Sequence, residues 1–289
     1  MPSERKPSDE RMLHVNLSLI NTSTMQLFRN GVIALDPNEV DIDVEFDHEF
    51  DDDHAEERLG HVRLVDTMII SDIHLGSDVS RSRDALKMLK SYGFKRLVIN
   101  GDVFDDLNFK RLRKEDWKFL SYIRKLSNPK RGVEVAWVAG NHDGIAQILT
   151  HLLGIPVFDE YIWEFENERY IAIHGHQFDK FLNENVVISA VACGFYKFFQ
   201  KIDSEQQRVT RWMKRRSKTW LRVSEKIAAD AIAYAKLKNA SYVFCGHTHQ
   251  AMELHEDNIH YYNSGCWTDK PANFITVASS SGVAIREYL

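Results

Sequence analysis

Short apolar runs alternate with amphipathic segments along the chain after residue 60. Residues 64–70 and 95–100 are apolar runs bounded by polar residues, which is typical of buried strands. Apolar side chains within 83–92 and 115–126 recur at spacings of three and four, which predicts two helices with one buried face each. Strands that alternate with helices indicate an α/β architecture with parallel strand pairing.

The second half of the chain continues this pattern with shorter elements. Further strands are expected at 133–139, 170–173, 242–245, 259–262, 274–278 and 283–288, with a short helix at 145–153. The last three strands follow one another with little helix between them. We therefore expect them to form a second, partly antiparallel sheet.

One long segment interrupts the alternation. Residues 180–239 contain no proline and no strand pattern, so they predict two or more helices inserted between neighbouring strands. Within it, residues 197–226 hold ten basic and three acidic residues, with Trp212 and Trp220 among them. Such a segment can be a packed helix with a solvated face, a membrane-surface element, or a lid over an anionic substrate.

The first 60 residues have a different composition from the rest of the chain. Residues 36–57 include 12 acidic residues and no Lys or Arg, and 40–46 alternate as a strand with one acidic face would. A solvated tail or edge strand accounts for this pattern, and an acidic flap over a basic surface is the sharper alternative. We predict an appendage at 1–60 and one domain at 61–289, with 180–239 as its insertion.

Charge and cysteine content bound the setting in which the protein works. The chain has 42 acidic and 37 basic residues, and without the 12 acidic residues of 36–57 the remainder has 7 more basic than acidic ones. That balance suits an anionic substrate, although an ordinary solvated surface would look the same. The three cysteines form no zinc or disulfide pattern, and the chain starts with no signal peptide, so we expect a cytoplasmic protein. No apolar stretch is long enough for a transmembrane helix, and the basic insertion could contact a membrane surface peripherally.

Polar residues that can bind metals follow each strand of what we expect to be the first sheet. Asp72 and His74 end the first strand, and on an extended chain residues two apart point to the same side. Later strands are followed by Asp102 and Asp105, by Asn141, His142 and Asp143, by His174 and His176, and by His247 and His249. Ligands bind beyond the carboxyl ends of the strands in open α/β sheets, so these groups should converge.

The chemical types of these side chains indicate which metal ions they would bind. Imidazole, carboxylate and amide groups without thiolates suit Mn²⁺, Fe or Zn²⁺ better than Ca²⁺ or a structural zinc. Seven of these side chains, taken together as ligands, are too many for one ion but suffice for two ions that share a carboxylate. Two ions about 3.5–4 Å apart are suited to phosphate-ester hydrolysis.

In this order and spacing, the motifs resemble those of the calcineurin-like metallophosphoesterase superfamily. That family has Asp-x-His, Gly-Asp-x-x-Asp, Gly-Asn-His-Asp/Glu, a lone His and Gly-His-x-His, and residues 64–289 contain all five in the same order. The resemblance implies a four-layer αββα sandwich of two mixed sheets flanked by helices, with 180–239 as a helical cap. It also implies two divalent metal ions, for which Mn²⁺ is the expected metal and Fe or Zn²⁺ the alternatives.

The resemblance also implies a role for each residue. The first ion would be held by Asp72, His74, Asp102 and His249. The second would be held by Asp102, Asn141, His174 and His247. His142, positioned by Asp105, would act beside the phosphate as a general acid or as a stabiliser of developing charge, while a hydroxide between the metals attacks phosphorus. His176 is an alternative to His174, and we choose His174 because it directly follows the strand.

Within the superfamily, the chain is most similar to the UDP-2,3-diacylglucosamine hydrolase group. The similar segments are 71–76, 174–179 and 263–267, together with the helical insertion. In that group the insertion forms a cap that takes acyl chains, and the basic face meets the diphosphate. By this likeness the substrate residues would be His176, Arg211, Trp212 and Arg215.

Several positions depart from that group and keep other activities open. The chain has His142 where the group has Arg, and His176 where the group usually has Asp. His142 is typical of general phosphodiesterases and phosphatases, which is the alternative function. A nuclease is less favoured because the body is only mildly basic, and a non-catalytic binding module is less favoured because every ligand position is present.

Overall fold

The computed structural model describes residues 14–15, 42–43, 63–143, 150, 153–179 and 218–289. The chain divides into two units, Met1–Gly60 and His61–Leu289. In the first unit, the strand β1 (His14–Val15) pairs antiparallel with β2 (Ile42–Asp43), which lies inside the segment expected to be a strand.

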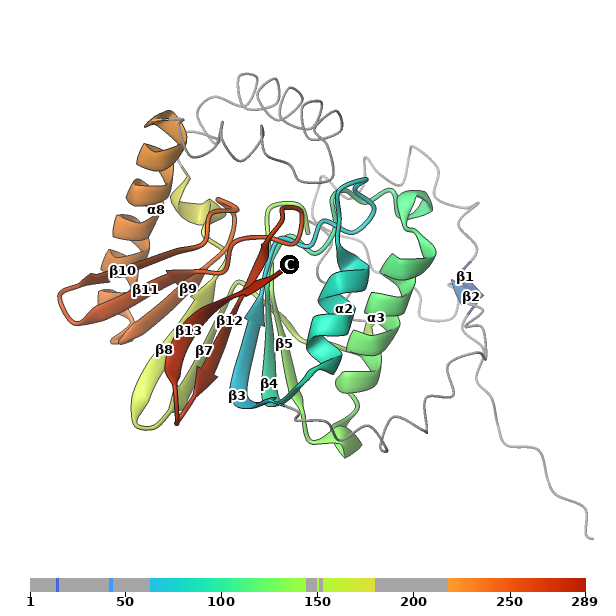
Figure 1. Cartoon of the computed structure of the whole chain (residues 1–289), viewed down its shortest axis with the longest axis horizontal. Coiled ribbons are helices and arrows are strands. Elements are labelled where there is room, and N and C mark those ends of the chain that lie inside the picture. Colours follow the sequence, from blue (N-terminus) through green and yellow to red (C-terminus); the bar gives the residue numbers. More distant parts are fainter. Residues whose placement is uncertain (1–13, 16–41, 44–62, 144–149, 151–152, 180–217) are drawn as a thin grey trace, which may run out of the picture. The chain divides into compact units, whose positions relative to one another are not determined.

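The second unit contains two mixed sheets (Figure 1). The six-stranded sheet has the order β13 (Gly282–Tyr288), β12 (Ala272–Ala278), β3 (Arg63–Ile70), β4 (Tyr92–Asn100), β5 (Glu134–Val138) and β6 (Val157–Phe158). The five-stranded sheet has the order β10 (Met252–Glu256), β11 (Ile259–Asn263), β9 (Tyr242–Cys245), β8 (Glu168–Ile173) and β7 (Glu160–Phe165). The helices are α2 (Ser82–Lys90), α3 (Lys114–Leu126) and α8 (Lys218–Leu237).

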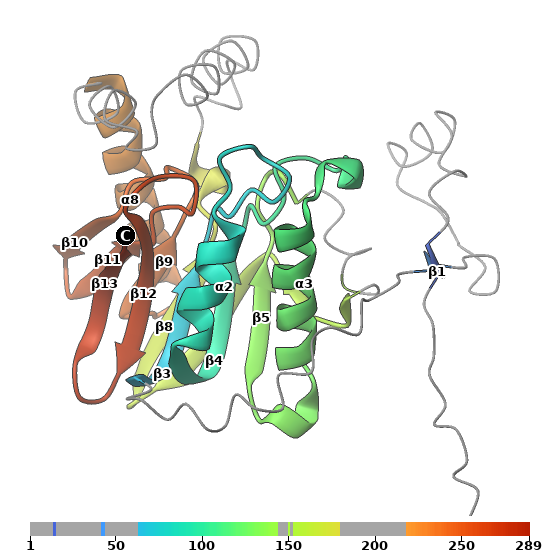
Figure 2. The same ribbon diagram turned by 45° about the vertical axis from the view of Figure 1, so that its right-hand side comes forward.

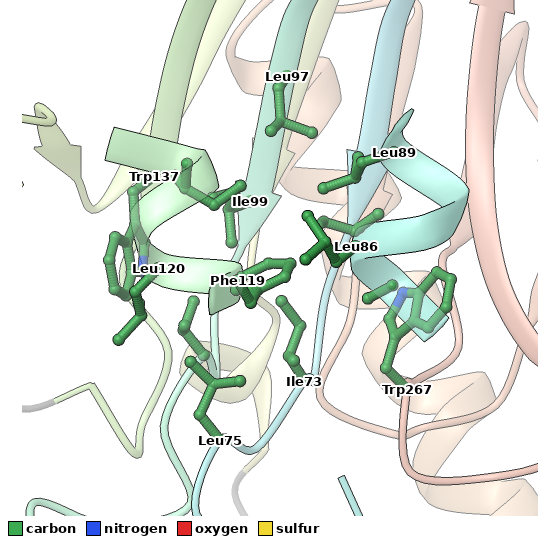
Figure 3. Close-up of a cluster of buried hydrophobic side chains, with 14 of the residues drawn as sticks. Ile73, Leu75, Leu86, Leu89, Leu97, Ile99, Phe119, Leu120, Trp137 and Trp267 are labelled. Carbon is green, nitrogen blue, oxygen red and sulfur yellow. The ribbon is translucent and has the colours of Figure 1, made fainter. Parts of the chain in front are cut away.

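The helices α2 and α3 lie side by side over one face of the six-stranded sheet (Figure 2). Their apolar faces, which include Leu89 and Phe119, pack against Leu97 and Ile99 of β4 in one buried cluster (Figure 3). Leu86 and Leu89 of α2 and Phe119, Leu120, Ile123 and Leu126 of α3 are buried as predicted. Tyr92 was also expected on the first helix, but it begins β4 and is only partly buried.

The opposite face of the six-stranded sheet packs on the five-stranded sheet. Ile69 and Val98 point into this interface, whereas their neighbours in sequence belong to the helix-side cluster. Trp163 and Tyr170 stack there with ring centroids 5.4 Å apart. Because the central strands are covered on both faces, their sequences are continuous apolar runs rather than alternating ones.

The helix α8 covers the outer face of the five-stranded sheet (Figure 1). Its buried residues Ala228, Ala231, Ile232 and Ala235 form one stripe, and the small alanines let the helix approach the sheet closely. The layers are therefore helices, sheet, sheet and helix. This confirms the predicted four-layer αββα sandwich.

Three expectations about the strands need correction. The last three strands do not form a second sheet of their own: β11 joins β9, whereas β12 pairs antiparallel with β3 and carries β13 with it. The strands before His174 and His247 belong to the second sheet rather than the first. In addition, the structure has strands β6, β7 and β10, which the sequence patterns did not indicate.

Two predicted helical segments fall largely outside the described residues. Of the helix expected at 145–153, residues 145–149 and 151–152 lie outside the described residues. Of the cap expected at 180–239, residues 180–217 lie outside them, and the described part is α8 with the two residues after it. Among the helices that are described, none has the length and apolar character to cross a membrane.

Candidate metal centre

Five loops meet at one end of the sandwich, the upper end in Figure 1. Three of them follow the parallel strands β3, β4 and β5 of the six-stranded sheet, and two follow the parallel strands β8 and β9 of the five-stranded sheet. The carboxyl ends of strands from both sheets therefore face a common region. The candidate ligands reach it from two sheets, not from one.

The loop after β3 sends alternate side chains in opposite directions. Ile73 and Leu75 are buried in the helix-side cluster (Figure 3). Asp72 and His74 instead approach His249 of the five-stranded sheet, with contacts of 3.1 Å from each. An extended chain was expected here from the sequence, and that expectation is wrong. Asp72 and His74 have φ of 52° and 50°. Hydrogen bonds to the main chain of Gly101 and Asp102 hold this conformation.

Five candidate ligands have a left-handed backbone conformation, which in the described part of the chain is otherwise found outside glycine in the turns at Glu166–Asn167, Asn239 and Asp257–Asn258. Asp72, His74, Asp102, His247 and His249 all have φ between 50° and 66°. For residues other than glycine this conformation costs on the order of 1–3 kcal/mol each. Packing and hydrogen bonds around these loops must offset that free energy.

The ligand atoms form three overlapping groups, each with its atoms within 4.8 Å of one another. The groups are Asp72, His74 and His249; His74, Asp102 and His142; and Asp102, His174 and His247. Asp102 and His74 each belong to two of them, and Asp102 is 2% exposed. Of the two, only Asp102 has two ligand oxygens, so it is the residue placed to contact two ions at once.

The hydrogen bonds of His174 determine which of its nitrogens faces Asp102. Its Nδ1 lies 2.7 Å from the carbonyl oxygen of Asn100. A carbonyl only accepts hydrogen bonds, so Nδ1 donates and Nε2 keeps the lone pair. Nε2 lies 3.3 Å from Asp102 Oδ2 and has no hydrogen-bond partner among the described residues.

Two acceptors that face each other in a buried site need a cation between them. Burial alone would lower the pKa of His174, but the Asp102 carboxylate raises it to about 9. A proton on Nε2 is one way to satisfy the pair, and a divalent ion in the same gap is another. The buried nitrogen without a partner and the all-imidazole-and-carboxylate donor set fit a transition-metal ion.

The other histidines of the site have their own charge states. Burial lowers the pKa of His74 to about 4, which keeps its ring neutral, as a metal ligand must be. Burial would also lower the pKa of His249, but Asp72 raises it well above its ordinary value. Burial would raise the pKa of Asp102, but His174 holds it well below its usual range.

His142 lies at the edge of this centre, next to His74, with ring centroids 5.0 Å apart. Its backbone N–H donates to Asp102 Oδ1 at 2.9 Å, and its Nδ1 lies 2.7 Å from the carbonyl oxygen of Asp105. The Asp105 carboxylate contacts other groups: Oδ1 is 3.7 Å from His74 Nδ1 and Oδ2 is 3.0 Å from Arg111 Nη1. Asp105 therefore meets the His142 ring through its main chain.

Asp143 holds the two neighbouring loops together. It is buried, and its carboxylate accepts hydrogen bonds from the backbone of Val103, Phe104 and Gly140 and from the Trp137 indole, at 3.0–3.3 Å. Burial, with Asp102, raises the pKa of Asp143 to about 6. Its four donors fix the loop that follows β5 against the loop that follows β4.

Two glycines allow the loops to approach the ligand carboxylates. A Cβ atom on Gly140 would lie 2.2 Å from Asp102 Oδ1, and one on Gly246 would lie 2.4 Å from Asp72 Oδ2. No side chain fits at such distances. Glycine is thus required at both positions because the backbone lies so close to the ligand carboxylates.

The structure gathers some sequence-predicted residues more closely than others. Asn141 is exposed in the turn before His142. His176 is half-buried with its ring centroid 5.5 Å from that of His174, and it belongs to none of the three groups. Burial lowers its pKa to about 4. The candidate substrate residues Arg211, Trp212 and Arg215 lie outside the described residues.

Two residues that contact the centre were not predicted. Arg111 binds the Asp105 carboxylate, and Asp179 binds His247. Arg111 lies in a short basic run, and Asp179 lies five residues after His174 in a segment already singled out. Neither position has a spacing that distinguishes it from an ordinary surface charge.

A family model for calcineurin-like phosphoesterases matches residues 66–251. The match covers more than half of the chain and spans every candidate ligand from Asp72 to His249. The chain belongs to the calcineurin-like phosphoesterase family. It is a hydrolase with candidate ligands for divalent metal ions.

Several solved structures are similar to this phosphoesterase at low identity. The phosphoesterase Yfce of E. coli is 20% identical, with 76% of this chain and 97% of that chain covered and a TM-score of 0.39. An archaeal phosphodiesterase is 15% identical, with 77% and 98% covered and a TM-score of 0.44. Vps29 of Entamoeba histolytica, in complex with zinc, is 11% identical, with 77% and 97% covered and a TM-score of 0.38. No curated protein matches the chain. The family assignment rests on the match over 66–251.

Proposed function

We propose that this protein hydrolyses a phosphoester or diphosphate with the help of two divalent metal ions. The observation that carries the proposal is the position of Asp102, which is shared by two groups of candidate ligands. A shared carboxylate can hold two ions close together, and two neighbouring ions stabilise the attacking and leaving oxygens of an in-line displacement at phosphorus. Membership of the calcineurin-like phosphoesterase family supports the same chemistry.

The proposed ligands divide between the two ions as follows. The first ion is held by Asp72, His74, Asp102 and His249, and the second by Asp102, Asn141, His174 and His247. Bound ions would lower the pKa of water and offset the negative charge of the phosphate. We propose Mn²⁺ for both positions, with Fe or Zn²⁺ as alternatives of the same ligand preference.

His142 is the proposed proton donor or charge-stabilising group. Its Nδ1 donates to the Asp105 carbonyl, which leaves Nε2 as the nitrogen available to a substrate oxygen. A protonated Nε2 can donate to the leaving oxygen, and a fixed ring orientation makes that donation efficient. Arg111 supports the arrangement because it anchors the side chain of Asp105.

For the substrate, we propose a diphosphate of the UDP-2,3-diacylglucosamine type, linked to lipid. Support comes from segments 71–76, 174–179 and 263–267, and from the ten basic residues of 197–226 that suit an anionic, membrane-associated ligand. His176, Arg211, Trp212 and Arg215 are the proposed substrate contacts. A cytoplasmic protein with peripheral membrane contact is consistent with this substrate.

A second candidate is a general phosphodiesterase that acts on nucleotides or other diphosphates. His142 favours it, because an imidazole beside the phosphate can protonate a wide range of leaving groups. The two candidates share the metal centre and differ in what binds beyond it.

A substrate panel separates these candidates. Mn²⁺-loaded protein is offered UDP-2,3-diacylglucosamine, a bis-aryl phosphate and common nucleotides, and the products are identified by mass spectrometry. Release of UMP and the lipid phosphate at a kcat/KM well above that of the other substrates is expected for the first candidate. Faster cleavage of the bis-aryl phosphate or nucleotides would support the second instead, and no cleavage of any substrate would contradict phosphoester hydrolysis.

A further inference from the structure

Asp179 holds one ring nitrogen of His247. Its Oδ2 lies 3.0 Å from His247 Nε2, and the two side chains are 6% and 7% exposed. Asp179 directly follows the short 3-10 helix η5 (His176–Phe178) that comes after β8, whereas His247 follows β9. The contact therefore joins two loops of the five-stranded sheet next to the candidate metal centre.

The hydrogen bond decides the tautomer of His247. An ionised carboxylate only accepts hydrogen bonds, so Nε2 must carry the proton. In the neutral ring, Nδ1 then keeps its lone pair, which is the form that a metal ion binds. The backbone N–H of His247 donates at 3.1 Å to each carboxylate oxygen of Asp72, so the main chain is held as well as the ring.

Comparison with the neighbouring histidines shows what is particular to this pair. In His174 and His142, Nδ1 donates to the backbone carbonyl oxygens of Asn100 and Asp105. For His247 the acceptor is a buried carboxylate. A carboxylate partner orients the ring and also makes the other nitrogen more basic, which a neutral carbonyl does more weakly. Asp179 itself belongs to none of the three ligand groups, so it supports the ring from outside.

We propose that Asp179 is a positioning residue that fixes His247 as a metal ligand and strengthens its bond to one of the two ions. This inference rests on the proposed function, because it requires a metal centre to which His247 contributes. A purely structural tie between the two loops would stabilise the fold without changing metal affinity. Metal affinity therefore distinguishes the two roles.

The test is a metal titration of the full-length protein after chelation, with Mn²⁺ or Zn²⁺ alone as the probe. Asp179→Ala should weaken the binding of one ion about 10–100-fold and leave the other unchanged. Asp179→Asn keeps an acceptor oxygen but loses the charge, so it should weaken the same ion about tenfold. Calorimetry gives both affinities, and metal content after gel filtration gives the stoichiometry.

The control is Asp66→Ala. Asp66 is an aspartate in an ion pair as well, with Arg96 at 3.5 Å and its side chain 15% exposed, but it lies in the first half of β3, away from the loop that carries Asp72 and His74. Both of its ion affinities should equal those of the wild type. Thermal unfolding in excess chelator reports folding separately, and Asp179→Asn decides the question if Asp179→Ala does not fold.

Each outcome has a definite meaning. Two sites with wild-type affinity in a folded Asp179→Ala or Asp179→Asn protein would overturn the positioning role and leave the proposed function intact. Fewer than two ions bound by the wild type would overturn the two-ion centre, and the role of Asp179 with it.

Discussion

The two sheets contribute different chemistry to the candidate metal centre. The loops of the six-stranded sheet bring both carboxylates, Asp72 and Asp102, together with His74 and His142. The loops of the five-stranded sheet bring only imidazoles: His174, His247 and His249. Within the three ligand groups, both carboxylates thus come from one sheet, and the other sheet supplies histidines only.

Among the described residues, the five-stranded sheet has no ligand group of its own, whereas the group of His74, Asp102 and His142 lies entirely in loops of the six-stranded sheet. Each of the two groups that include a residue of the five-stranded sheet also needs a carboxylate of the six-stranded sheet. The apolar interface between the sheets therefore sets the distances between ligands, although none of its side chains is a ligand. Three predictions test this contrast, in order of decreasing expected effect.

The largest effect is expected for Asp102→Asn, which removes the charge shared by two groups. An amide cannot bridge two ions as a carboxylate does, so several kcal/mol of transition-state stabilisation should be lost. We expect turnover of a bis-aryl phosphate with Mn²⁺ to fall by at least about 10³-fold while the fold is kept. Steady-state kinetics and circular dichroism measure the two quantities, with Asp66→Asn as the control. Wild-type turnover in Asp102→Asn would refute the shared-carboxylate mechanism.

The second test loosens the packing between the sheets. Trp163 is 5% exposed and stacks on Tyr170 and Phe244 with centroids 5.4 and 5.6 Å away. Trp163→Ala should lower the free energy of unfolding by about 3–5 kcal/mol and weaken metal binding in the folded protein. Denaturant unfolding and metal titration measure both.

Phe119→Ala is the matched control for this test. Phe119 is fully buried between the helices and the six-stranded sheet, away from the interface of the two sheets. A similar loss of stability with unchanged metal affinity is expected. Equal losses of metal affinity in both variants would show that the centre does not depend on the sheet interface in particular.

The smallest of the three effects is expected for His142→Ala. Loss of a proton donor that is not a main metal ligand should lower kcat by roughly 10²-fold, or about 3 kcal/mol, with little change in metal content. The pH profile of kcat should lose one limb at the same time. His255→Ala, on the exposed strand β10, is the control. If metal content and turnover fell together, His142 would instead be a structural or metal-ligating residue.

The sequence alone was informative about local elements and about which side chains carry the chemistry. The strand at 242–245 and the helix faces with Leu89 and Phe119 were predicted because each depends on residues close together in the chain. The candidate ligands could be named because Asp, Asn and His recur beside glycine after each strand. The family to which these motifs pointed is the one whose model matches residues 66–251.

Only the tertiary structure decided how these pieces combine. The sequence pattern of β12 does not say that Ile275 pairs with Ile69, some two hundred residues earlier, because strand pairing uses backbone groups that every residue has. The left-handed conformations of Asp72 and His74 arise from bonds to the next loop, not from their own preferences. The contact of Asp179 with His247 likewise depends on two loops that meet only when β8 and β9 lie side by side. Composition and spacing thus predicted the candidate ligands, and long-range packing determined the distances between them, their tautomers and their partners.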